Sequence, residues 1–255
     1  MSQDSPLNFQ NANSRETEWN RAANLEKDER PMSQVKKLVL KGGVDVVFFR
    51  GDTPQLIVAG ESREATSRIT TRFSGDKLVI EQEGVTISGA GGNIHVSGSG
   101  NVVAGRDVYV GGIRMQFNGP VGSFHGGDVV NTGGQCIVGI VLPEAPKIRI
   151  NGSSDITLYD LKQSDLDIDI SGSGDVTAYG QVEHLEADVQ GSGDIDTTEL
   201  KAASANLTIA GSGDMDVYVT QSVKARIAGS GDIKVRGNPP SRDHSVAGSG
   251  KVKFK

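Results

Sequence analysis

The chain has 255 residues, a formal net charge of −6 and a sequence pI near 5.3. This acidic balance disfavours nucleic acid and anionic membrane surfaces as partners, because both are bound through clustered Lys and Arg. Glycine numbers 34 while aromatic residues make up only 5%. That composition disfavours a core of large side chains and suits a fold that turns tightly and often.

The compartment is predicted from what the sequence lacks. No stretch approaches the ~20 continuous apolar residues of a membrane span, and the first residues show neither the basic start nor the apolar run of a secretory signal. Cys136 has no second cysteine to pair with, which favours a reducing compartment. We therefore expect a cytoplasmic protein, or a cell-surface protein if a signal has been removed.

Residues 1–34 are predicted to form a polar N-terminal arm, partly helical or disordered. Ser14 is placed to cap a helix over about residues 15–30, and Pro31 lies just past its end. The arm is either a flexible tail or a segment that docks on a neighbouring subunit, with Trp19 as the oligomer anchor.

From Val35 onward the pattern changes to short runs rich in β-branched residues, separated by turns of Gly, Asp and Pro. Residues 35–83 are predicted to form N-terminal solenoid coils. Residues 84–134 are the richest in glycine and are predicted to be a β insertion of narrower coils or hairpins. A glycine-rich loop is the alternative for this segment, and the regular return of Val and Ile disfavours it.

The most informative feature is a Gly-Ser-Gly-Asp motif that recurs in residues 135–255. Its fourth position recurs at spacings of 20, 19, 20, 18 and 19 residues, which is typical of stacked coils. The fourth positions are Asp155, Asp175, Asp194, Asp214, Asp232 and Lys251.

Two further positions of each repeat are apolar in every copy. Five residues before the motif's fourth position stand Ile150, Ile170, Val189, Ile209, Ile227 and Val246. One residue after it stand Ile156, Val176, Ile195, Met215, Ile233 and Val252. These columns predict a parallel β-solenoid with coils of about 19–20 residues, in which the columns stack as aliphatic ladders inside the coils.

The Gly-Ser-Gly-Asp series, the strand Val44 to Val47 after Gly42 and Gly43, and the later Ile148 to Gly152 together resemble the putative auto-transporter adhesin head GIN domain family. The resemblance implies a right-handed, parallel β-helix-like fold in bacterial proteins, often exposed at the cell surface, with no established catalytic residues.

The motif aspartates have two interpretations. In the favoured one, each carboxylate accepts hydrogen bonds from turn amides while the flanking glycines adopt positive φ. In the other, the stacked carboxylates of Asp155, Asp175, Asp194, Asp214 and Asp232 bind calcium. The known calcium solenoids have a nine-residue repeat, which disfavours this second interpretation.

A possible binding stripe lies four residues after the motif, on the outward face, at Tyr159, Tyr179 and Tyr218. Aromatic side chains there suit a sugar or a partner protein, although packing between neighbouring strands is the plainer explanation. The sequence contains neither a nucleophile elbow nor a phosphate-binding loop. We expect no catalytic residue, no metal site and no cofactor.

These features favour a non-catalytic structural or interaction protein, a self-associating β-solenoid that presents a binding surface. We expect a homo-oligomer, because the end coils of a solenoid expose unpaired strand edges that must be capped or paired. The alternative is an adhesin-like or carbohydrate-binding surface head with a protein or glycan ligand. A polysaccharide-active enzyme is disfavoured, since no repeat position gathers acids with basic partners.

Overall fold

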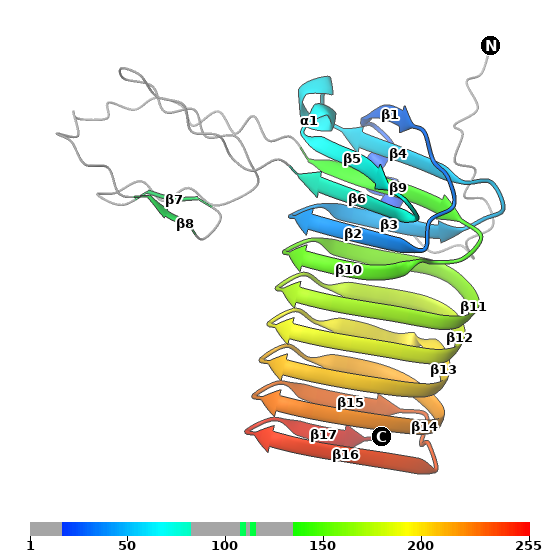
Figure 1. The fold of residues 1–255 in the computed structure, drawn as a ribbon, viewed down its shortest axis with the longest axis vertical. Coiled ribbons are helices and arrows are strands. Elements are labelled where there is room, and N and C mark those ends of the chain that lie inside the picture. Colours follow the sequence, from blue (N-terminus) through cyan, green and yellow to red (C-terminus); the bar gives the residue numbers. More distant parts are fainter. Residues whose placement is uncertain (1–16, 83–107, 111–112, 116–134) are drawn as a thin grey trace.

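The computed structural model describes residues 17–82, 108–110, 113–115 and 135–255. In these residues the chain winds into a β-solenoid whose coils stack along the long axis (Figure 1). The predicted all-β solenoid is confirmed. No helix in the described part of the chain is long and apolar enough to cross a membrane.

Four long strands form the centre of the stack and bend from one face of the solenoid to the other. The first residues of β11 pair with β3 on one face, and its last residues pair with β10 on the opposite face. These four strands are β11 (Asp155–Gly172), β12 (Val176–Gly191), β13 (Ile195–Gly211) and β14 (Met215–Gly229). Each is parallel to the next, in register over most of its length.

Shorter strands extend both faces. The face that contains β10 (Lys147–Gly152) also contains β6 (Lys77–Gln82), β2 (Lys37–Gly42) and, at the far end, β16 (Ser241–Gly248). The face that contains β3 (Asp45–Arg50) also contains β9 (Cys136–Leu142), β15 (Asp232–Arg236) and β17 (Lys251–Phe254).

The two predicted apolar columns lie in the core except for their last members, since Val246 is 40% exposed and Val252 is only partly buried. Ile170 pairs in register with Val189, Val189 with Ile209 and Ile209 with Ile227, and all four are at most 3% exposed. Each such side chain contributes roughly 1.5–3 kcal/mol by leaving water. A single coil has no interior of its own, so this stabilisation exists only in the stack.

Glycine is required at two positions of every Gly-Ser-Gly corner, for two different reasons. The first glycine of each motif has positive φ, as at Gly211 with φ 149°. The second glycine lies against the coil before it: a Cβ on Gly213 would come within 2.0 Å of the carbonyl oxygen of Gly193. A methyl group there is incompatible with the spacing between coils.

The N-terminal end departs from the predicted coils. β4 (Gln55–Gly60) runs antiparallel to β9, and β1 (Glu26–Arg30) runs antiparallel to β4. On the other face, β5 (Ile69–Ser74) is antiparallel to β6. Residues 35–83 therefore form only part of the parallel stack, because β4 and β5 turn back to close its end.

The helix predicted over residues 15–30 is wrong in its described part. Only the 3-10 helix η1 (Glu18–Ala22) forms, and the chain then continues as β1 along the edge of β4. Residues 17–34 are thus part of the end cap, and the extended backbone of β1 is favoured there because it satisfies the outer edge of β4.

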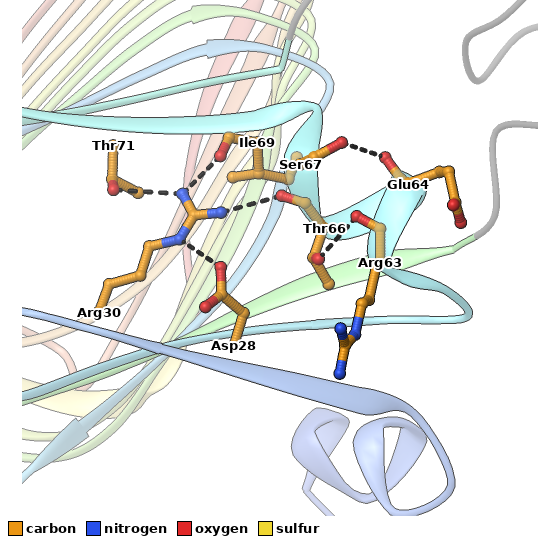
Figure 2. Close-up of polar contacts among 8 residues, drawn as sticks. All are labelled: Asp28, Arg30, Arg63, Glu64, Thr66, Ser67, Ile69 and Thr71. Carbon is orange, nitrogen blue, oxygen red and sulfur yellow. Dashed lines mark hydrogen bonds and ion pairs between the residues drawn. The ribbon is translucent and has the colours of Figure 1, made fainter.

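Arg30 connects the strands of this cap. Its guanidinium donates to the carbonyl oxygens of Thr66 (2.9 Å) and Ile69 (2.5 Å), to the hydroxyl of Thr71 (3.2 Å) and to Asp28 (3.0 Å) (Figure 2). Thr66 belongs to the short helix α1 (Arg63–Ser67), which lies across the end of the stack (Figure 1). One side chain from β1 therefore ties α1 and β5 to the opposite face.

The predicted glycine-rich insertion, residues 84–134, falls largely outside the described residues. Its described part is an antiparallel pair, β7 (Val108–Val110) with β8 (Ile113–Met115). Lys41 pairs with Glu81, and Asp45 pairs with Ile137. Gln82 and Gln135 therefore occupy the register positions that Gly42 and Gly43 occupy at the corner of the neighbouring coil.

The C-terminal coil forms a polar end. On β16, Arg242 pairs with Val223 and His244 with Ala225, so both occupy positions that are apolar in the other coils. The Arg242 guanidinium carbon lies 4.5 Å from the centre of the Phe254 ring, and His244 meets the same ring edge-on. Inward-pointing charges of this kind protect an exposed sheet edge from pairing.

The first prediction concerns the corner glycines. Gly213→Ala should lower the free energy of unfolding by about 3 kcal/mol or more, because the new methyl group meets a backbone oxygen of the preceding coil. Its control is Ser212→Ala, at the exposed position between the two glycines, with an expected change within about 0.5 kcal/mol. Urea unfolding followed by circular dichroism measures both, and equal midpoints would contradict the interpretation.

The second prediction concerns the C-terminal end. The unmodified chain should be monomeric, whereas the double variant Arg242→Leu/His244→Val should associate, because it makes the last coil apolar and leaves its strand edges unpaired. Multi-angle light scattering gives the mass of each. Arg226→Leu on the outward face is the control and should remain monomeric. A double variant with the same mass as the unmodified chain would show that these side chains do not protect the end.

Candidate functional site

The motif aspartates form a hydrogen-bonded ladder along one corner. The amide of Asp175 donates to Oδ1 of Asp155 (2.9 Å), and the amide of Asp194 donates to Oδ1 of Asp175 (2.9 Å). The same bond links Asp194 to Asp214, Asp214 to Asp232 and Asp232 to Lys251, with lengths of 2.7, 2.7 and 2.9 Å. Each carboxylate therefore accepts the turn amide of the following coil.

The corner motif has an earlier copy that its spacing in the sequence did not reveal. Asp45 pairs in register with Asp155, so its corner, Gly42-Gly43-Val44-Asp45, is an earlier copy of the motif. Its carboxylate lies 3.1 Å from the guanidinium of Arg21 instead of accepting the amide of the next Asp. The residues separating Asp45 from Asp155 obscure this copy, because the period of about 20 is broken there.

The two ends of the ladder differ in electrostatics. Burial raises the pKa of Asp155, and the nearby carboxylates of Asp175 and Asp45 raise it further, against the opposing effect of the hydrogen bond from the Asp175 amide. At Asp232 the ammonium group of Lys253, 2.8 Å away, lowers the pKa of the carboxyl. The described residues contain no group of three or more His, Cys, Asp or Glu arranged to hold a metal ion.

The structure brings together two of the three predicted tyrosines. The rings of Phe49, Tyr159 and Tyr179 stack in sequence, with centroids 5.2 and 5.1 Å apart. Tyr218 is separated from them, because the strand register shifts between Thr197 and Lys201. Tyr159 is only 9% exposed and Tyr218 is 36% exposed, so the three rings do not form one continuous surface.

Trp19 packs against its own chain in this structure. It is 6% exposed and lies over Gly139, where a Cβ would come within 2.6 Å of the indole ring. The amide of Glu18 donates to the hydroxyl of Tyr159 (3.3 Å). η1 therefore covers the aromatic stack from outside, and the predicted role of Trp19 on a neighbouring subunit would require this contact to be exchanged between chains.

A polar groove of about 550 Å³ crosses the outward face of β11, β12, β13, β14 and β16. Two rows of residues in strand register line it. The first row is Asp165, His184, Ser204, Ser222 and Ser241. The second row is Asp167, Glu186, Asn206, Lys224 and Asp243.

The shape of the groove follows from these side chains. Ser204, Ser222 and Ser241 are short, while residues of the second row, such as Glu186 and Lys224, are long. Nδ1 of His184 lies 2.6 Å from the hydroxyl oxygen of Ser204. The floor and one wall are thus made of hydrogen-bonding groups on a rigid sheet.

Comparisons with known proteins agree with the resemblance seen in the sequence. Residues 130–239 match the sequence model of the family described as “Putative auto-transporter adhesin, head GIN domain”. This stretch includes β10 to β14 and most of the groove. No curated protein matches the chain in sequence.

Two solved structures share the fold. A putative adhesin from Bacteroides fragilis is 15% identical, with a TM-score of 0.56 over 91% of this chain and 97% of its own. A putative adhesin from Parabacteroides merdae is 16% identical, with a TM-score of 0.50 over 91% of this chain and 96% of its own. At these identities the likeness shows the fold.

The third prediction concerns the two ends of the Asp ladder. Side-chain ¹³C NMR should show Asp155 titrating above the ordinary pKa of an aspartate and Asp232 below it. Lys253→Met should raise the pKa of Asp232 and leave that of Asp155 unchanged, since only Asp232 loses a cation. An Asp232 titration that is unaffected by the substitution would contradict the assigned cause.

The same shifts fix the sign of the pH dependence of stability. The lowered pKa of Asp232 stabilises the fold above the ordinary aspartate pKa, and this contribution is lost as the pH falls through the lowered value. Asp155 acts in the opposite sense. Its raised pKa means that the folded state loses stability as the pH rises from the ordinary value through the raised one.

Proposed function

We propose that this chain is a non-catalytic, adhesin-like binding protein of the cell surface, whose solenoid presents the groove to a partner. The proposal is supported mainly by the overlap between the part of the chain that matches the family and the part that forms the groove. Residues 130–239, which match the adhesin head family, include almost all of the coils that form the groove. A binding role uses what these coils offer, a rigid face with regularly spaced polar groups.

The groove chemistry favours binding over catalysis. The side chains of Asp165, His184 and Glu186 are exposed to solvent, whereas an acid or base catalyst is commonly tuned by burial in a site from which water is excluded. Asp167 is held by Lys147 at 2.6 Å. A polysaccharide-active enzyme is therefore not the function we propose.

Both ends of the stack disfavour end-to-end self-association. α1, β1 and β5 close one end of the stack, and Arg242 and His244 occupy the apolar positions of the last coil at the other. Charged side chains at both ends disfavour pairing between coaxial copies. A monomeric rod with a lateral binding face is the simpler arrangement.

The fourth prediction tests adhesion directly. Beads coated with the folded chain should be retained on at least one of four surfaces, coated with mucin, fibronectin, collagen or yeast cell-wall glucan. Retention should exceed that of albumin-coated beads and of beads carrying the heat-unfolded chain. No excess retention on any surface would overturn the proposed function, as would release of reducing sugar ends from the glucan by the chain.

A further inference from the structure

The groove also indicates what kind of ligand it fits. It spans five neighbouring strands, which at ~4.8 Å per strand corresponds to about 19 Å. A ligand that fills it must be extended and run across the strands, along the solenoid axis. Both rows repeat at this strand spacing, so the ligand meets a polar or charged group at each step.

Several ligand classes do not fit the lining. A phosphate-bearing chain would meet four carboxylates and a single lysine, Lys224. A lipid or an apolar peptide needs apolar side chains to contact, but Leu166, Leu185 and Val223 at the groove are buried within the solenoid. A peptide that adds a strand needs a free sheet edge. The strands under the groove are paired with one another, and the one free edge among them, that of β16, lies at the end of the groove, where an added strand would not fill it.

A strongly cationic ligand is disfavoured because two of the four groove carboxylates are already paired with a basic side chain outside the groove. Asp167 is paired with Lys147 at 2.6 Å, and Asp243 lies 3.9 Å from Arg226. In the count of groove charges, Lys224 offsets one of the two remaining acids, Asp165 and Glu186. The groove is therefore close to balanced in charge, which suits a neutral ligand.

Hydrogen bonding is what the lining does offer. Carboxylates only accept, a lysine only donates, and Ser, Asn and His can do both. A ligand with many hydroxyl groups has the same dual capacity and can match such a surface at every step. We propose that the groove binds a neutral, linear oligosaccharide along the solenoid axis, an inference that rests on the proposed binding function and names its ligand class.

This site differs from the tyrosine stripe predicted from the sequence. The stripe lies on the face of β3 and the first residues of β11 and β12, while the groove lies on the opposite face. The groove lining contains no Phe, Tyr or Trp. Because stacking on one of these large rings is absent, binding to one chain is weak, and adhesion through this site depends on many copies acting together.

The fifth prediction is tested by NMR on the full chain, with maltohexaose, cellohexaose and laminarihexaose as neutral probes and spermine as a cationic one. At least one hexasaccharide should shift the amide signals of His184, Ser204 and Ser222 in a saturable way, and spermine should not compete. Ser222→Ile fills the groove and should weaken that binding at least tenfold. Thr177→Ile is the control. It makes a comparable change from a polar residue to Ile on the β3 face of the solenoid, away from the groove, and should leave binding unchanged.

Three results would overturn the inference: no saturable shift with any hexasaccharide, shifts confined to Tyr179 and Tyr218, or shifts caused by spermine alone. Each can be separated from failure of the proposed function. If coated beads still adhere while the hexasaccharides leave the groove signals unmoved, the binding role stands and the ligand class is wrong. If the beads do not adhere, the function itself fails.

Discussion

The close contact between successive corners is the constraint on which the rest of the structure depends. At the second glycine of a motif, the carbonyl oxygen of the preceding coil occupies the space that a Cβ would need, as at Gly193 and Gly213. This contact brings each corner directly over the last. Once the corners coincide, the residues on either side of them pair in register, with shifts only farther along the strands, and the aliphatic ladders follow.

The one Gly-Ser corner that lacks the second glycine supports this account. At Ser154 the motif has serine in place of the second glycine, and the residue is fully buried. Its hydroxyl accepts from the amide of Val44 (3.1 Å) and donates to the carbonyl oxygen of Gly42 (3.2 Å). The preceding corner, Gly42-Gly43-Val44, is different in sequence and leaves room for a side chain that satisfies these backbone groups.

The repeated half of the fold could be predicted from the sequence because every coil repeats the same chemistry at the same position. The register of Ile170, Val189 and Ile209 is confirmed, and the motif aspartates accept backbone amides in the turns. The sequence did not specify that the aspartates accept amides from the following coil. That detail depends on the stacking of the coils and not on any single turn.

The N-terminal third could not be predicted in the same way, because its strands do not stack in chain order. β9 follows β4 by many residues, yet lies between β3 and β4. Antiparallel strands such as β4 and β5 carry the same alternating pattern as parallel ones, so composition does not reveal their direction. η1 shows the same limit, since the position of Trp19 over Gly139 depends on a contact across more than a hundred residues.

The groove was missed for a related physical reason. Large aromatic side chains are the clearest sign of a binding surface in a sequence, and for this reason Tyr159, Tyr179 and Tyr218 were the predicted binding residues. The hollow on the other face arises from short side chains, Ser204, Ser222 and Ser241, which attract little notice one at a time. Serine at a single outward strand position is unremarkable, but three in register on neighbouring strands lower the surface along a line. In a solenoid the binding surface is therefore a property of columns across coils, and it becomes visible in the sequence only once the register of the coils is known.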